Sequence, residues 1–122
     1  MKLNFLSFYG FQKNVLTFLQ RSKIFIMASK IEGLPVALME AMSCEKTVIA
    51  PSVDNIPTVL INNKTGYLLD KENTKNDISK ILDCAYKNYL EGDFLMKNAR
   101  NIIIEKYSYR YAIEKWHKIL DL

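Results

Sequence analysis

The stretch Glu32-Gly33-Leu34-Pro35-Val36-Ala37-Leu38-Met39-Glu40-Ala41-Met42 organises the rest of the chain. It follows an apolar run at residues 24–28 that has the length and composition of a buried strand. Gly33 and Pro35 then mark a turn into a helix, and proline suits the first helical position because no intrahelical acceptor exists there for an N–H. The segment therefore predicts a strand, a loop and a helix from about residue 35 to residue 44.

Two carboxylates flank the start of this predicted helix. Glu32 lies in the loop before it, and Glu40 lies more than a turn inside it. The N–H groups of Val36 and Ala37 are expected to point out of the helix start, where an anion is stabilised by the helix dipole. A ligand that carries phosphate, with hydroxyl groups at both ends, would suit this arrangement.

Predicted strands and helices also alternate on both sides of the motif. We predict strands at residues 3–9, 24–28, 47–50 and 66–69, a helix at 14–21 and a helical turn at 55–60. Strands that alternate with helices at this spacing favour an α/β fold with a parallel sheet. Residues 3–9 either pair beside residues 24–28 or remain an exposed edge. We expect them to pair.

Beyond Asp70 the pattern becomes helical. Asn73 or Thr74 can cap a helix that runs to about residue 90, and Glu91-Gly92-Asp93 interrupts it. Two further helices are predicted at residues 94–107 and 108–121.

Composition describes a small single domain. The chain has 122 residues, a net charge of +4 and 49% hydrophobic residues, which is enough to bury a core. Its 17 Lys and Arg residues are scattered among 13 acids, which argues against a nucleic-acid-binding protein. Cys44 and Cys84 fit neither a metal nor a disulfide spacing, and His117 has no catalytic neighbours. Without a signal or membrane-spanning run, we expect a cytoplasmic protein, with peripheral attachment to the inner face of the membrane left open.

The pair Glu32 and Glu40, separated by seven residues, resembles the Glu-x7-Glu motif of retaining glycosyltransferases of family 4, the group 1 glycosyl transferases, which have the GT-B fold. Residues 8–11 and 24–29 resemble the third and fourth strands of that family's C-terminal domain. Residues 47–50 and 64–69 resemble its fifth and sixth strands. The likeness extends to about Asp70. It implies a partial Rossmann-like sheet, residues 1–70, that binds a nucleotide sugar, followed by a helical part, residues 71–122, in one domain.

The resemblance also implies roles for individual residues. Glu32 would contact the donor sugar near the reacting centre, and Glu40 would hold the ribose. The backbone around Gly33, Leu34 and Val36 would approach the distal phosphate, and Gly10 and Phe11 would contact the base. From the residues alone, a solvated helix face explains Glu40, a loop glycine with positive φ explains Gly33, and a strand-ending turn with Phe11 in the core explains the last pair. With the resemblance, the donor-binding role is the expectation for Glu40 and Gly33, and both explanations of Gly10 and Phe11 stay open.

Some positions depart from the family pattern. Glu45 stands where a glycine commonly follows the motif helix, Asp54-Asn55 replaces a typical glycine pair, and Thr58 replaces a frequent Glu. A non-glycine in the left-handed conformation at Glu45 would cost on the order of 1 kcal/mol. The family's first two strands of this domain, which carry the Arg and Lys that neutralise the donor pyrophosphate, and its acceptor-binding N-terminal domain have no counterpart in the sequence.

Two functions follow as expectations. The first is the donor-binding part of a retaining glycosyltransferase, a truncated fragment that needs an N-terminal half to move a sugar from a nucleotide-diphosphate sugar to an acceptor hydroxyl, without a metal. The second is a non-catalytic module that binds a nucleotide sugar or pairs with a separately encoded half. In the resembled family the last helix crosses back to brace the other domain.

Overall fold

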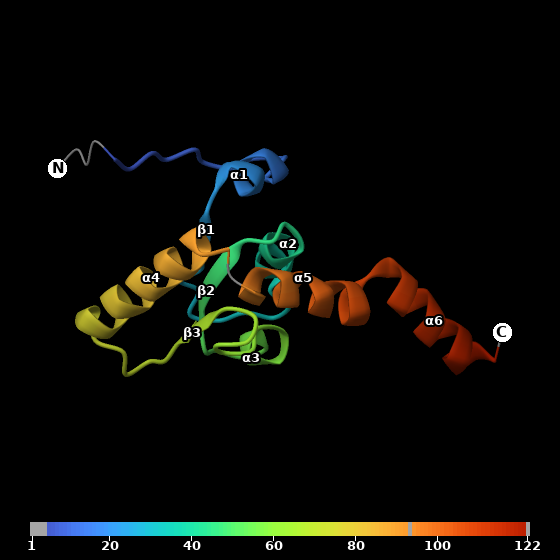
Figure 1. Cartoon of the computed structure of the whole chain (residues 1–122). Helices are drawn as coiled ribbons and strands as arrows, with labels where there is room; N and C mark the ends of the chain where they lie inside the picture. The colour runs from blue at the N-terminus through green and yellow to red at the C-terminus, as the bar shows by residue number, and fades with distance from the viewer. Residues whose placement is uncertain (1–4, 93, 122) are drawn as a thin grey trace.

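The computed structural model describes residues 5–92 and 94–121. Its sheet contains the parallel strands β1 (Ile24–Ile26), β2 (Thr47–Pro51) and β3 (Tyr67–Leu69), in the order β1-β2-β3 (Figure 1). Phe25 pairs with Val48 and Ala50 pairs with Leu68. The predicted α/β fold with a parallel sheet is confirmed.

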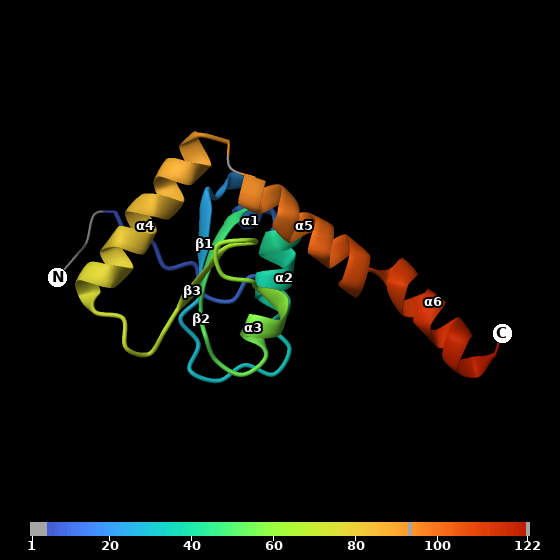
Figure 2. The same ribbon diagram turned by 60° about the horizontal axis from the view of Figure 1, so that its bottom comes forward.

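The helices are α1 (Leu16–Arg21), α2 (Val36–Ser43), α3 (Ile56–Val59), α4 (Lys75–Leu90), α5 (Phe94–Tyr107) and α6 (Tyr109–Leu120). Figure 2 shows α4 on one side of the sheet and α2 and α3 on the other. Successive residues of β2 face opposite sides, so Ile49 packs with Ala85 of α4, whereas Val48 packs in the larger cluster with Leu38 of α2. The helices of the C-terminal part thus help to cover the sheet.

Gly66, immediately before β3, permits close packing of that strand against β2. A Cβ atom at this position would lie 2.6 Å from Val48 Cγ2 and 2.7 Å from the Val48 carbonyl oxygen. The backbone oxygen cannot rotate away, so only glycine fits without a shift of the strands.

The N-terminus of α4 is capped by side chains of its own first turn. The Thr74 hydroxyl accepts the N–H of Asp77 at 3.3 Å, and an Asp77 carboxylate oxygen accepts the N–H of Thr74 at 2.9 Å. The hydrogen bond from the Thr74 hydroxyl, followed by that from the Thr74 backbone, lowers the pKa of Asp77. Of the two predicted caps, Thr74 is therefore the one that is used.

Helix α6 extends away from the sheet towards the C-terminus (Figure 1) and has no buried residue between Tyr109 and Leu120. Its inner side contributes Tyr111 and Trp116 to an apolar hollow of about 410 Å³, which Leu34 and Met39 border from the motif region. Trp116 retains 59% of its exposure.

Residues 5–9 do not form the predicted strand, and the expectation that they pair with residues 24–28 was wrong. Within the described residues, β1 pairs only with β2, and Phe5 and Phe8 are 85% and 89% exposed. The apolar side chains occupy both odd and even positions, so pairing would place them on both faces of the sheet edge. Instead, Tyr9 packs edge-on against Phe18 of α1, with ring centroids 5.0 Å apart. Residues 3 and 4 lie outside the described range.

Candidate functional site

Helix α2 is held by one apolar face. Leu38, Ala41 and Met42 are fully buried, whereas Val36 and Glu40 are exposed on the outward side. Burial of this kind contributes roughly 1.5–3 kcal/mol for each large aliphatic side chain. The inward face thus fixes the helix and leaves its start and its outer side accessible.

The start of α2 has no side-chain cap. Pro35 is the residue before the helix rather than its first residue, and its φ of −79° and ψ of 69° describe an inverse γ-turn. The N–H of Val36 donates to the Leu34 carbonyl at 2.8 Å, so it is not free as expected. Within the described residues, the N–H groups of Ala37 and Leu38 have no acceptor. Leu38 is fully buried, so of the two predicted donors the N–H of Ala37 is open to a ligand and that of Val36 is not.

Glu32 is half-buried and fixed from two directions. One carboxylate oxygen, Oε1, accepts the hydroxyl of Ser29, while the backbone N–H of Glu32 donates to Asp54 Oδ2 at 2.8 Å. In the part of the chain that the structure describes, Oε2 has no hydrogen-bond partner. That oxygen is free to accept a hydroxyl from a ligand.

Glu40 occupies the exposed side of α2, one turn after Val36. Its carboxylate takes part in no ion pair among residues 5–92 and 94–121. The structure does not bring Glu40 into the hydrogen-bond network of Glu32. Its role at a ribose therefore stays a prediction.

The three remaining predicted positions have different surroundings. Gly33 does not have a positive φ, so that explanation for it was wrong, and a Cβ atom there would meet open space. Gly10 has a φ of +62°, in the left-handed region that favours glycine. Phe11 is 94% exposed, so it is not a core residue. Whether Gly10 and Phe11 contact a base stays a prediction.

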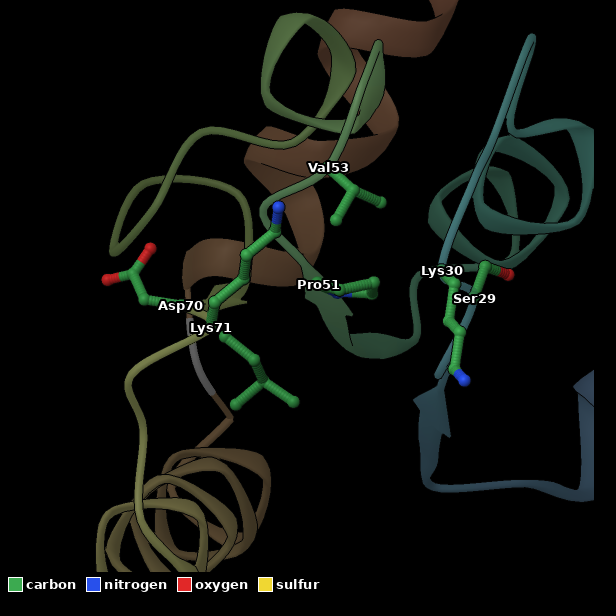
Figure 3. Close-up of a pocket in the computed structure, with 7 residues that line it drawn as sticks. Ser29, Lys30, Pro51, Val53, Asp70 and Lys71 are labelled. Atoms are coloured by element: carbon green, nitrogen blue, oxygen red, sulfur yellow. The ribbon is translucent and has the colours of Figure 1, made fainter.

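A cavity of about 400 Å³ opens at the carboxyl ends of all three strands (Figure 3). Ser29 and Lys30 line it after β1, Pro51 and Val53 at the end of β2, and Leu69, Asp70 and Lys71 at the end of β3. Ligands of parallel α/β sheets bind outside the carboxyl ends of the strands. Because Ser29 also holds Glu32, this cavity adjoins the motif loop.

The sequence interpretation missed Lys30, Asp70 and Lys71 as cavity residues. In Figure 3, Lys30 approaches from one side of Pro51, and Asp70 and Lys71 come from the other. Neither lysine forms an ion pair with a described residue. The available signal was positional, because each of the three follows closely after a predicted strand.

Metal and membrane features are limited. Across the described residues, no group of three His, Cys, Asp or Glu side chains is placed to hold a metal ion. No helix in the same residues is long and apolar enough to cross a membrane. Cys44 and Cys84 are free thiols.

Curated relatives share this chain's sequence over most of its length. A poly(ribitol-phosphate) α-N-acetylglucosaminyltransferase of Staphylococcus aureus is 35% identical over 104 residues, which are 84% of this chain and 21% of that protein. A UDP-Gal:α-D-GlcNAc-diphosphoundecaprenol α-1,3-galactosyltransferase of Escherichia coli is 24% identical over 93% of this chain and 28% of its own length. The chain thus spans less than a third of each of these relatives.

Solved structures show the same fold. The crystal structure of TarM matches with a TM-score of 0.75 and 29% identity over 93% of this chain and 23% of that one. A C-terminal domain of a group 1 glycosyl transferase from Francisella tularensis matches with a TM-score of 0.70 and 21% identity, over 85% of this chain and 53% of that domain. The model of the family described as glycosyl transferases group 1 matches residues 2–106. This chain belongs to the group 1 glycosyltransferase family.

Proposed function

We propose that this chain is the donor-binding part of a retaining glycosyltransferase of family 4, which transfers a sugar from a nucleotide-diphosphate sugar to an acceptor hydroxyl. The observation that carries the proposal is the arrangement around Glu32. Its carboxylate is held by Ser29, next to an uncapped helix start and beside the cavity at the strand ends. Anionic and hydroxyl-bearing parts of one ligand would meet complementary groups there.

Each part of the site has a role in this proposal. The backbone N–H groups of Gly33, Leu34 and Ala37 stabilise the diphosphate as its charge increases. The free oxygen of Glu32 accepts a sugar hydroxyl, and Glu40 accepts the ribose hydroxyls. Gly10 and Phe11 lie against the base.

In the reaction, the bond between the anomeric carbon and the leaving phosphate oxygen breaks. The acceptor oxygen bonds to that carbon on the same face, and the leaving phosphate helps to take the acceptor proton. No metal is required by this scheme, because the start of α2 stabilises the leaving group.

The isolated chain is proposed to bind donor but to transfer sugar only when an N-terminal half is supplied. It spans 21% of the Staphylococcus relative and 28% of the Escherichia relative, so more than two thirds of each relative lies outside the match. A catalytic site that must exclude water and align two substrates needs both sides. We place the protein in the cytoplasm, where nucleotide sugars are available, with peripheral membrane attachment still open.

A second candidate is a non-catalytic module that binds a nucleotide sugar or pairs with a separately encoded half. Among the described residues β1 has one unpaired edge, and the exposed apolar side chains within residues 5–9 also favour this candidate. Transfer activity in a mixture with a complementing N-terminal half would separate the two, because only the first candidate gains turnover.

Calorimetric titration of UDP, GDP and their sugars into the chain tests the proposal. The Escherichia relative is named for a UDP-linked donor, so the UDP series comes first. We expect millimolar binding that Glu40→Ala weakens by roughly tenfold, the loss expected for hydrogen bonds to a charged group. Glu114→Ala, which removes an exposed glutamate of α6, serves as the matched control and should bind normally. No binding by the unmodified chain would overturn the proposal, and unchanged binding by Glu40→Ala would remove Glu40 from the site.

A further inference from the structure

We propose that Asp54 and Asn55 are positioning residues that hold Glu32 in register for a donor sugar. This inference rests on the proposed function and extends it to residues outside the Glu-x7-Glu motif. It concerns the two positions at which this chain departs from the glycine pair of the resembled family.

The side chains of Asp54 and Asn55 bind the first N–H and the last carbonyl of the dipeptide Glu32-Gly33. Asp54 Oδ2 accepts the N–H of Glu32 at 2.8 Å, and Asn55 Nδ2 donates to the Gly33 carbonyl at 2.8 Å. Both bonds join residues that are 22 positions apart. Glu32 and Gly33 are thus tied to a different strand-end loop, and we call Asp54 and Asn55 the clamp.

The clamp itself has a rigid base. It immediately precedes α3, whose residues Ile56 and Val59 are essentially fully buried. The Asn55 carbonyl also accepts the hydroxyl of Thr58 at 2.6 Å. Core packing therefore restrains the clamp, and the clamp in turn restrains the exposed motif loop.

The backbone at Asp54 adds a second observation. Its φ is +44°, in the left-handed region that glycine occupies without strain. Aspartate tolerates this region less well than glycine does, so the side chain carries a conformational cost at this position. The contact with Glu32 gives that side chain a function that a glycine could not perform.

The geometry assigns the clamp an effect on the sugar rather than on the nucleotide. Ser29 orients Oε1 of Glu32, and the clamp fixes the backbone from which that side chain extends. Because Glu32 is restrained in this way, it presents Oε2 to the donor sugar in a fixed position. Among the described residues, neither Glu40, which would hold the ribose, nor the helix amides, which would hold the phosphates, form a hydrogen bond or ion pair with the clamp.

The test compares affinities for UDP and for a UDP sugar, measured by calorimetry on the full chain. Asp54→Gly is the main variant because glycine accepts the backbone conformation and only the carboxylate is lost. We expect the affinity for the UDP sugar to fall roughly tenfold while the affinity for UDP stays within about twofold. Asp54→Asn retains an acceptor oxygen and should restore most of the difference, and Asp83→Ala, at an exposed position of α4, should have no effect.

Amide hydrogen exchange at Glu32 separates a failure of the clamp from a failure of the proposed function. Asp54→Gly should accelerate exchange at Glu32, and Asn55→Ala should disturb the Gly33 carbonyl and the following amide resonance. Unchanged exchange, or an equal loss of UDP and UDP-sugar affinity, would overturn the positioning role. If the unmodified chain bound no nucleotide but exchange at Glu32 still depended on Asp54, the proposed function would fail while the clamp remained as a structural contact without a donor.

Discussion

The first turns of α2 and α4 differ in whether their backbone N–H groups have hydrogen-bond acceptors. At α4, Thr74 and Asp77 satisfy each other's backbone N–H groups. At α2, Pro35 supplies no side-chain cap, and among the described residues the N–H groups of Ala37 and Leu38 find no acceptor. A helix start that leaves donors open must be held by something other than its cap.

What holds α2 is its inward face, which α4 uses much less. Leu38, Ala41 and Met42 are fully buried in α2, although that helix has only 8 residues. Helix α4 has 16 residues, of which Ala85 is buried. A cap therefore stabilises the start of α4, whereas packing stabilises α2 and leaves its start available to a ligand.

Removing the inward anchor of α2 should give the largest effect. Leu38→Ala is expected to lower the free energy of unfolding by roughly 2–5 kcal/mol, because it deletes a fully buried side chain. Val36→Ala is the matched control on the exposed side of the same helix, and we expect a loss below about 0.5 kcal/mol. Urea unfolding followed by circular dichroism measures both. Equal losses would show that α2 is not held by its inward face.

Removing the cap of α4 should have a smaller effect. Thr74→Ala is expected to lower the free energy of unfolding by about 1 kcal/mol, since it removes the capping hydroxyl. Ser79→Ala, an exposed change inside the same helix, should cost nothing measurable. The same urea assay applies, and a Thr74→Ala protein as stable as the control would contradict the account of this helix start.

The end of α2 offers a gain in stability. Glu45 has a φ of +54° and closes the helix through hydrogen bonds from Glu45 N–H to Met42 and from Lys46 N–H to Ala41. Glu45→Gly should therefore raise the free energy of unfolding by roughly 0.5–1 kcal/mol. Its contact with Arg100, 3.7 Å long and half-exposed, contributes little. Glu105→Gly in the interior of α5 should be destabilising, and a loss at both positions would refute the strain at Glu45.

The smallest expected effect is the loss, in acid, of the stability that the Asp77 carboxylate contributes to the α4 cap. Because the Thr74 hydroxyl and backbone lower the pKa of Asp77 in the folded chain, the ionised carboxylate stabilises the fold above the ordinary aspartate pKa. That contribution is lost as the pH falls through the lowered folded pKa. The stability difference between the unmodified chain and Asp77→Asn should thus be present at neutral pH and close at the acid end. A difference that persists unchanged in acid would exclude this linkage.

Much of the fold follows from local sequence patterns. The apolar run at residues 24–28, the proline and glycine of the motif loop and the Thr74 cap each predicted an element that the structure contains. The left-handed conformation of Glu45 was expected from the resemblance, because a glycine commonly follows the motif helix in that family. These features depend on neighbours within a few residues, which is why the sequence alone reveals them.

The features that escaped prediction depend on distant or missing neighbours. Residues 5–9 have strand-like composition, but a strand requires a partner edge, and the described chain offers none that suits their apolar pattern. The hydrogen bonds of Asp54 and Asn55 to the motif loop cross 22 residues, and the turn at Pro35 diverts the Val36 amide. Spacing between the two glutamates identifies the site but does not report what holds it.

Helix α6 also makes the protein optically informative. Its indole at position 116 is the single tryptophan of the chain, and it stands largely in water beside the hollow that Leu34 and Met39 border. Emission from Trp116 will therefore respond little to loss of the distant core, but it will shift to shorter wavelength when a molecule covers that hollow. Without any added label, the chain carries a fluorescent sensor next to its motif loop.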